Sequence, residues 1–375
     1  MTPVADLVAD PTRVDDAEVR ADRRRRLFAA MAGHGLDALV LGRPAEVAFA
    51  SGARQLWTAG SRPFGPACVA VRGTGRVHLL SVWDADVPPE VGHDDLYGLS
   101  WNPAVLAASL AAIPGLPDAG RVGTTSSSPG FPRLLAAVAP GAEVVDGGPA
   151  LAAARGPKSA AEVARIRAAT AIARAGLDAM AGALRPGATE RGLLAAYLEA
   201  IAGRGAPAPP TEGVVCATPA RGPVALRRIA TNTPIEAGQL VALDAGGFCR
   251  GYEGGVGRTL VCPPAAPTAA QEDLAARCRA ALAAVVAACR PGATGRDLRA
   301  AWAATGAPEP PEPLAHGVGL GVEPPVVGAG VGDAAVLAPG TVLAVTAWVA
   351  AEGAGGHLER DLVLVTGGEP EVLGS

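Results

Sequence analysis

A repeated segment constrains the fold of this chain more than any other feature. Residues 185–196 have the sequence RPGATERGLLAA, and residues 290–301 have the similar sequence RPGATGRDLRAA. Each copy follows a long alanine-rich helical pattern and precedes a shorter one, and a strand-rich segment comes next, at 213–259 and at 316–366. Two copies of one element order predict a duplicated α+β unit with a pseudo-two-fold axis. Residues from both copies should therefore converge on one site.

A separate domain should precede this duplicated unit. Strand and helix patterns alternate over residues 15–152, which predicts an α/β layer domain. Residues 1–14 lack such a pattern and are expected to form a flexible tail. Ser159 and Glu162 have the spacing of a capping box, in which each side chain binds a free amide at a helix start. This helix opens a second domain over residues 159–375.

Composition and charge exclude several classes of function. The 375 residues carry a formal net charge of −4, so no nucleic-acid partner is expected. No apolar run reaches the length of a membrane span, and the polar start of the chain does not resemble a signal peptide. The six cysteines form no CxxC pair, which is typical of reduced thiols in the cytosol. We expect a cytoplasmic protein with neither a membrane nor a nucleic-acid partner.

Asp244 is the first candidate for chemistry. It ends the apolar run that begins at Leu240, and a glycine-rich segment follows it. A carboxylate at the end of a buried strand costs free energy unless a partner pairs with it. The alternative is a turn aspartate before two glycines, which needs no such partner. The polar candidates in the second copy are His316, Glu323, His357 and Glu359.

Six motifs follow one another along the chain: KSAAEVARIRAA at 158–169, RPGATE at 185–190, LVALDAGG at 240–247, GYEGGVGRT at 251–259, HGVGLGVEPP at 316–325 and LVLVT at 362–366. As a set they resemble the pita-bread family of methionine aminopeptidase, prolidase, aminopeptidase P and creatinase. The resemblance implies an α+β pita-bread fold in the second domain, preceded by a creatinase-type α/β domain. It also implies a homodimer, in which Trp57, Thr58 or Arg62 would line the site of the other subunit.

The resemblance further implies a site for two divalent ions, which share bridging carboxylates and activate a water for attack on a peptide carbonyl. Its usual ligands are two aspartates eleven residues apart, one histidine and two glutamates. Asp244 matches the first aspartate, and His316 matches the histidine. Gly255 stands at the position of the second aspartate and Thr346 at that of the first glutamate, so these two ligands are lost.

The position of the last glutamate is ambiguous in the sequence. Counted without a gap it falls on Arg360, and with one inserted residue it falls on Glu359. A two-metal site cannot be assembled from Asp244, His316 and Glu359 alone, because hard divalent cations need several oxygen ligands. We therefore expect no cofactor. The alternative is a single divalent Mn, Co or Zn ion held by these three residues.

Three functions follow from these residues. The first is a non-catalytic descendant that binds a small molecule or short peptide, or serves as a dimer partner. The second is a metal-free, creatinase-like hydrolase or lyase for a small C–N or amide substrate. In it His316 would be the acid/base, oriented by Asp244 or Glu323, while Arg227 or Arg228 would hold a substrate carboxylate. The third is an active, metal-dependent Xaa-Pro aminopeptidase or dipeptidase.

Overall fold

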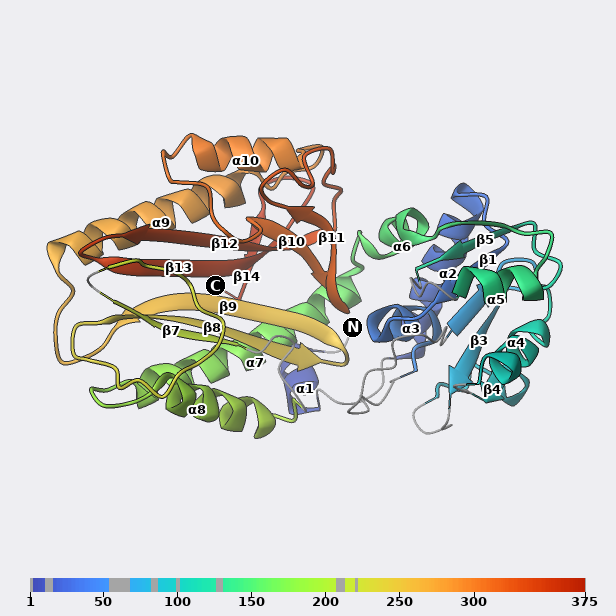
Figure 1. The fold of residues 1–375 in the computed structure, drawn as a ribbon, viewed down its shortest axis with the longest axis horizontal. Coiled ribbons are helices and arrows are strands. Elements are labelled where there is room, and N and C mark those ends of the chain that lie inside the picture. The colour runs from blue at the N-terminus through green and yellow to red at the C-terminus, as the bar shows by residue number, and fades with distance from the viewer. Residues whose placement is uncertain are drawn as a thin grey trace. The chain divides into compact units, whose positions relative to one another are not determined.

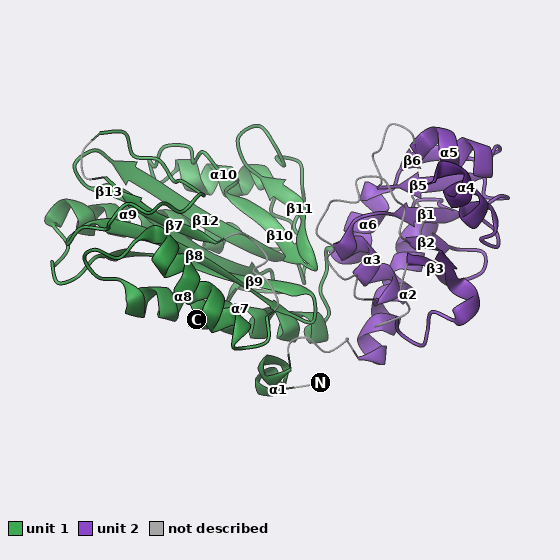
Figure 2. Cartoon of the chain, turned by 60° about the horizontal axis from the view of Figure 1, so that its bottom comes forward, with its two compact units in different colours: residues 1–13, 156–375 green, residues 14–155 purple. Residues whose placement is uncertain are grey.

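The computed structural model describes residues 3–10, 16–53, 68–81, 87–98, 102–125, 131–206, 213–219 and 222–374. The chain forms two units, one of residues 14–155 and one of residues 1–13 with 156–375 (Figure 2). Trp57, Thr58 and Arg62, which we expected at a subunit contact, lie outside the described residues. No helix within the described ranges is long and apolar enough to cross a membrane.

The first unit has the expected alternation of strands and helices. Its described strands form a sheet in the order β4-β3-β2-β1-β5-β6. The strands are β1 (Ala38–Leu41), β2 (Cys68–Val71), β3 (Arg76–Ser81), β4 (Leu96–Gly98), β5 (Arg121–Thr124) and β6 (Glu143–Asp146). The helices are α2 (Ala17–Gly33), α3 (Pro44–Ser51), α4 (Pro103–Ala111), α5 (Phe131–Val138), α6 (Gly148–Arg155) and the 3₁₀ turn η1 (His93–Asp95). A core of buried side chains such as Val40, Leu110 and Leu135 joins α4 and α5 to the sheet.

The second unit is built on a larger sheet, whose described strands run in the order β11-β10-β12-β13-β9-β8-β7, with β14 paired to β13. The strands are β7 (Val214–Thr218), β8 (Leu240–Cys249), β9 (Tyr252–Val261), β10 (Ala315–Gly319), β11 (Gly321–Val327), β12 (Val342–Ala351), β13 (Gly355–Leu364) and β14 (Glu371–Leu373). The helices are α7 (Ala160–Ala183), α8 (Glu190–Ala202), α9 (Ala269–Ala288) and α10 (Gly295–Ala303). Figure 1 shows α7 and α8 along β7–β9, and α9 and α10 along β12 and β13.

The repeated RPGAT segments make the same turn in both halves of this unit. Each lies between a long helix and a short one, α7 and α8 in the first half and α9 and α10 in the second. Gly187 and Gly292 have φ of +83° and +81°, a backbone conformation that glycine adopts without steric cost. Thr189 and Thr294 then cap α8 and α10, because each side chain accepts a hydrogen bond from an amide of the first turn.

Strand alternation separates the two faces of this sheet. Leu243 of β8 packs in the core beneath α7 and α8, and Val345 of β12 and Val363 of β13 pack in the core beneath α9 and α10. Successive side chains of a strand point to opposite faces. The even-numbered positions 244, 346 and 360 therefore face away from the helices. This face carries the candidate site.

The start of the chain differs from our expectation of a flexible tail over residues 1–14. Val4–Ala9 form helix α1, and its Leu7 is fully buried in the core that α7 contributes to. The sequence pattern was weak because a helix of 6 residues is too short to show a helical period of apolar positions. Tertiary packing, rather than helix propensity, stabilises such a short helix.

Candidate functional site

One row of residues crosses four neighbouring strands on the helix-free face. In the strand register, Asp244 of β8 lies opposite Gly257 of β9, Gly257 lies opposite Arg360 of β13, and Arg360 lies opposite Thr346 of β12. His316 of β10 pairs with Ala344, which is two residues from Thr346 and therefore on the same face. The two copies of the repeat thus bring Asp244 and His316 to one place.

Arg360 lies between these two residues and contacts both. Its Nη1 donates a hydrogen bond to Asp244 Oδ2 at 2.6 Å, and its Nη2 lies 3.3 Å from His316 Nε2. The side chains of Arg360 and Asp244 are only 14% and 7% exposed, so the ion pair is largely shielded from water. Asp244 Oδ1 is buried as well and makes no hydrogen bond within the described residues. The guanidinium is therefore the cation that compensates the Asp244 carboxylate.

Gly257 makes this contact across a strand possible. Arg360 and Asp244 belong to β13 and β8, and β9 runs between them. A Cβ added at Gly257 would lie 2.5 Å from Leu358 Cδ2 and 3.0 Å from Arg360 Cβ, well inside normal contact distances. Gly255 is different, because a Cβ there would meet only Ala245 O at an ordinary 3.5 Å. Position 255 thus has room for a Cβ atom, whereas position 257 does not.

The contact with Arg360 also fixes the tautomer of the His316 imidazole. A guanidinium can only donate hydrogen bonds, so Nε2 must be the acceptor and Nδ1 carries the proton. Burial, and then the positive charges of Arg360 and Arg228, lower the pKa of His316 to about 4. The ring is therefore neutral at pH 7, with one nitrogen already engaged.

Glu359, which we expected as a possible metal ligand, faces the other side of the sheet. Its Oε1 lies 3.0 Å from His357 Nε2, and its Oε2 lies 3.3 Å from Arg258 Nε. Glu359 is four residues from Val363, which packs beneath α9 and α10, so strand alternation places both side chains on the helix-covered face. The expectation that Glu359 joins Asp244 and His316 is thereby corrected: Arg360 holds that position, as the ungapped count indicated.

Glu323 does not orient His316 either. Its carboxylate forms an ion pair with Lys158, and each of these side chains is only 2% exposed. Lys158 Nζ also donates to Gly156 O at 2.8 Å, at the start of the second unit. The pair therefore ties β11 to the segment that leads into α7, and this correction removes Glu323 from the candidate catalytic residues.

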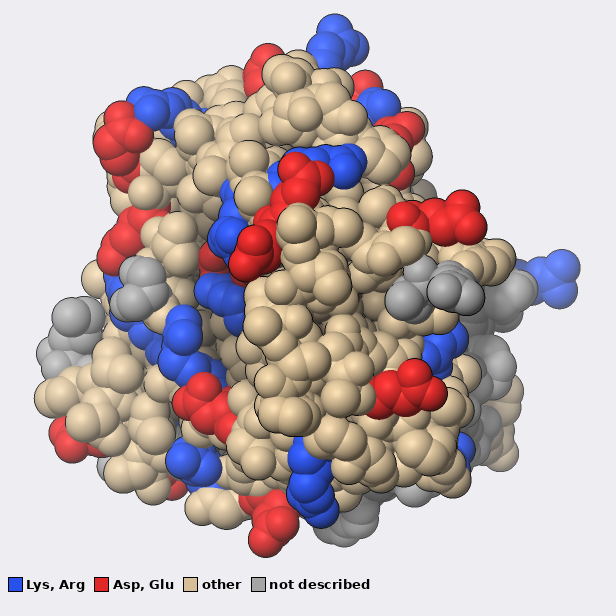
Figure 3. Space-filling model, turned by 90° about the vertical axis from the view of Figure 1, so that its left-hand side faces the viewer, with Lys and Arg blue, Asp and Glu red and all other residues tan. Residues whose placement is uncertain are grey.

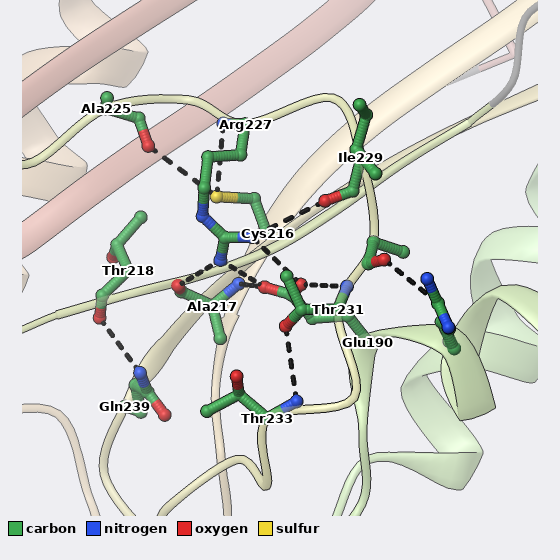
Figure 4. A network of polar contacts seen from close by, with 12 residues as sticks. Glu190, Cys216, Ala217, Thr218, Ala225, Arg227, Ile229, Thr231, Thr233 and Gln239 are labelled. Atoms are coloured by element: carbon green, nitrogen blue, oxygen red, sulfur yellow. Dashed lines mark hydrogen bonds and ion pairs between the residues drawn. The ribbon is translucent and has the colours of Figure 1, made fainter.

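Arg227 belongs to a structural network rather than to the row around Arg360. Its Nη2 and Nη1 donate to the two carboxylate oxygens of Glu190 at 2.5 and 3.1 Å, and the amides of Ala217 and Thr231 each donate to Glu190 at 2.7 Å (Figure 4). Burial alone would raise the pKa of Glu190, but these hydrogen bonds outweigh it and hold the pKa below its ordinary value. The network fixes the segment after β7 to the start of α8.

Arg228 points in a different direction from Arg227 and reaches the segment before β10. Its Nη2 donates to Glu312 Oε2 at 2.6 Å, and its side chain remains 58% exposed. Glu312 precedes His316 by four residues, and the positive charge of Arg228 contributes to the lowered pKa of His316. Of the two arginines predicted to bind a substrate, Arg228 is therefore the one beside the site.

Apolar side chains occupy the same face next to the row. Ala242, Trp348 and Leu358 are two residues from Asp244, Thr346 and Arg360 respectively, and they are buried in one cluster. The cluster also contains Val214 and Cys216 of β7 and, from the segment that follows, Val224 and Leu226. The row of Asp244, Arg360 and His316 thus lies next to a cluster of packed apolar side chains.

Side chains of the types that hold metal ions are not clustered in the described residues. Within the ranges given above, no group of three or more His, Cys, Asp or Glu side chains is placed to hold one ion.

Acidic and basic side chains are interleaved over the face drawn in Figure 3. That distribution agrees with the small net charge of −4.

Comparison with known proteins gives a consistent result. Residues 164–367, more than half of the chain, match Metallopeptidase family M24. No curated protein sequence matches the chain. Among solved structures, the dipeptidase PepE from Mycobacterium ulcerans is 24% identical with a TM-score of 0.78, and the match covers 97% of both chains. The Xaa-Pro dipeptidase from Bacillus anthracis is 20% identical with a TM-score of 0.76, over 94% of this chain and 97% of that one.

A third solved structure shows a similar likeness. The prolidase from Pyrococcus horikoshii OT3 is 22% identical with a TM-score of 0.75, over 94% of this chain and 98% of that chain. At these identities the likeness is one of fold. The predicted family resemblance and the α+β pita-bread fold are confirmed.

Proposed function

Since the chain belongs to metallopeptidase family M24, we propose that it is a member in which an arginine has replaced the catalytic metal pair. It does not carry out two-metal hydrolysis, and it acts as a non-catalytic module that binds a small molecule or short peptide. The observation that carries this proposal is the position of Arg360, with Nη1 2.6 Å from Asp244 Oδ2 and Nη2 3.3 Å from His316 Nε2.

The chemistry of the donor set supports the proposal. A two-metal site needs several carboxylate oxygens that contact or bridge the ions. Here Asp244 and His316 remain, but Gly255 and Thr346 offer no carboxylate on the same face. Arg360 is always protonated, so its guanidinium would repel a divalent ion placed between Asp244 and His316. The residues present do not fit the metal pair of the family.

The metal-free hydrolase receives less support from the contacts. A general base must be able to reach its proton and needs a pKa near the working pH. His316 has a pKa of about 4, and its Nε2 accepts a hydrogen bond from Arg360. Asp244 forms an ion pair with Arg360, and Glu323 forms one with Lys158. Neither carboxylate is therefore placed to orient the imidazole of His316.

Metal analysis and an activity assay test the proposal directly. The full-length protein is incubated with Mn²⁺ or Co²⁺, dialysed, and then analysed for bound metal and for hydrolysis of Xaa-Pro dipeptides. We expect far less than one metal ion per chain and no hydrolysis above the buffer rate. Stoichiometric metal with turnover that Asp244→Ala abolishes would overturn the proposal. Light scattering of the same sample tests the homodimer, which stays a prediction.

A variant with restored carboxylates provides the positive control. Gly255→Asp, Thr346→Glu and Arg360→Glu together place three carboxylates beside Asp244 and His316, and a Cβ at position 255 makes only an ordinary contact. We expect this variant to bind Mn²⁺ in a calorimetric titration, whereas the parent protein does not. A folded variant without Mn²⁺ affinity would show that these positions are not the former ligand positions.

A further inference from the structure

The edge of the site next to His316 offers hydrogen-bond donors. Because Nε2 accepts from Arg360, the proton of the neutral ring is on Nδ1. His316 Nδ1 has no hydrogen-bond partner in the part of the chain that the structure describes. Within the described residues Nδ1 is not one of the fully buried polar atoms without a partner, so this N–H group can donate to an acceptor from outside the protein.

Arg228 supplies further donors at the same edge. Glu312 engages its Nη2, while a guanidinium has five N–H groups in all. The side chain is 58% exposed, so ligands in solution can reach the remaining groups. The ion pair with Glu312 holds Arg228 to the segment that leads into β10, where His316 lies.

Neither carboxylate oxygen of Asp244 is available to a ligand. Oδ2 of Asp244 is taken by Arg360, and Oδ1 is buried from solvent. Burial and the positive charges of Arg360 and Arg228 all lower the pKa of His316. A ligand that approaches His316 therefore meets N–H donors, while the two nearby carboxylates, Asp244 and Glu312, are already paired with Arg360 and Arg228.

We propose that His316 Nδ1–H and Arg228 form a binding site for a small oxyanion, with a monocarboxylate as the preferred form. This inference rests on the proposed function, because it requires that Arg360 rather than metal ions occupies the space beside His316. Arg360 holds the imidazole in its neutral, Nδ1-protonated form, and the planar fork of Arg228 suits a carboxylate. A site that is built for cations elsewhere in the family is here built for an anion.

The test is an NMR titration of the histidine side chains in the full-length protein. The chain has only five histidines, and a His316→Gln variant identifies the resonance of interest. Sodium acetate, inorganic phosphate and sodium chloride are added separately at constant ionic strength and pH 7.5. We expect a saturable shift of the His316 signal with acetate and a weaker one with phosphate. A linear response that chloride reproduces would refute the site, and tighter binding of phosphate would refute the preference for a carboxylate.

Three variants assign the site to Arg228. Arg228→Gln should weaken acetate binding about tenfold, the effect of losing one charge-assisted hydrogen bond. Glu312→Gln should strengthen it, because it frees Arg228 from its partner. Arg290→Gln is the matched control, since Arg290 is an exposed arginine paired with Glu369 at the end of α9. Equal affinities in the Arg228 and Arg290 variants would refute the assignment.

Failure of this inference can be distinguished from failure of the proposed function. If the protein binds neither metal nor acetate, only the anion site is refuted. If the protein binds Mn²⁺ stoichiometrically and hydrolyses dipeptides, the proposed function is refuted together with the anion site that depends on it.

Discussion

Arg360 Nη1 lies 2.6 Å from Asp244 Oδ2, although the two residues belong to strands that are not neighbours in the sheet. The side chain of Arg360 passes over Gly257 of the intervening strand to make this contact. Removing two charges from water is costly, and a buried pair is retained only when its geometry is good. Here the same guanidinium also contacts His316, so one side chain completes the polar row.

Gly257→Ala should destabilise the protein. The new Cβ would be forced against Leu358 and Arg360, and overpacking of this kind costs roughly 1–3 kcal/mol. Gly255→Ala is the matched control in the same strand, because its Cβ meets only an ordinary contact with Ala245 O. Urea unfolding of both variants measures the difference. Equal loss of stability in the two would contradict the crossing of Arg360 over Gly257.

Arg360→Gln should be strongly destabilising because it leaves the buried Asp244 carboxylate without its cation. Breaking one side of a buried ion pair costs roughly 3–5 kcal/mol. The double variant Arg360→Gln with Asp244→Asn removes both charges and should recover part of this loss. Urea unfolding of the two single variants and the double variant gives the coupling energy. Strictly additive effects would show that the two residues are not a pair.

His316 should titrate with a pKa of about 4 in an NMR pH series of the folded protein. Arg228→Gln should raise this pKa, since the charge of Arg228 disfavours the imidazolium, whereas Arg290→Gln should leave it unchanged. An ordinary pKa near 6.5 in the parent protein would contradict the buried contact with Arg360.

The same shift makes stability depend on pH. The folded state resists protonation of His316 while the unfolded state accepts a proton near pH 6.5. The contribution of His316 is thus fully present above pH 6.5 and is lost as the pH falls towards about 4. The slope in this window is at most about 1.4 kcal/mol per pH unit. Unfolding experiments at several pH values should show a shallower dependence for His316→Gln.

Arg227 and Arg228 are neighbours in sequence, but their substitutions should differ in effect. Arg227→Ala removes the cation from Glu190, whose side chain is only 1% exposed, and should cost about 1–3 kcal/mol. Arg228→Ala breaks a more exposed pair and should cost less than about 1 kcal/mol. Chemical unfolding of both variants tests this order, and a reversed order would contradict the assignment of Arg227 to the structural network.

Lys158→Met should destabilise the second unit because it removes the buried ion pair between Lys158 and Glu323. Both side chains are 2% exposed, so roughly 3–5 kcal/mol is expected. Adding Glu323→Leu also removes the second buried charge of the pair and should restore part of the stability. If Glu323→Leu alone has no effect on thermal unfolding, the pair does not stabilise the fold.

Much of the architecture follows from local sequence. The RPGAT segments carry a glycine for the left-handed turn and a threonine for the helix cap, so each specifies its own turn whatever surrounds it. The duplicated order of helices and strands placed Asp244 and His316 in equivalent halves, which led us to expect that they converge. The missing carboxylates at Gly255 and Thr346 are likewise visible in the sequence.

The partners of the charged residues were decided by the tertiary structure. Glu359 and Arg360 are adjacent in sequence, and a shift of one residue in a strand exchanges the two faces of a sheet. Only the pairing of β13 with β9 and β12 places Arg360 beside Asp244. The same pairing places Glu359 on the helix-covered face, where it contacts Arg258. Sequence determined which charges the chain carries and the turns between its helices. Tertiary pairing decided which charges meet, because a buried ion pair depends on register and on the glycine that lets a side chain cross a strand.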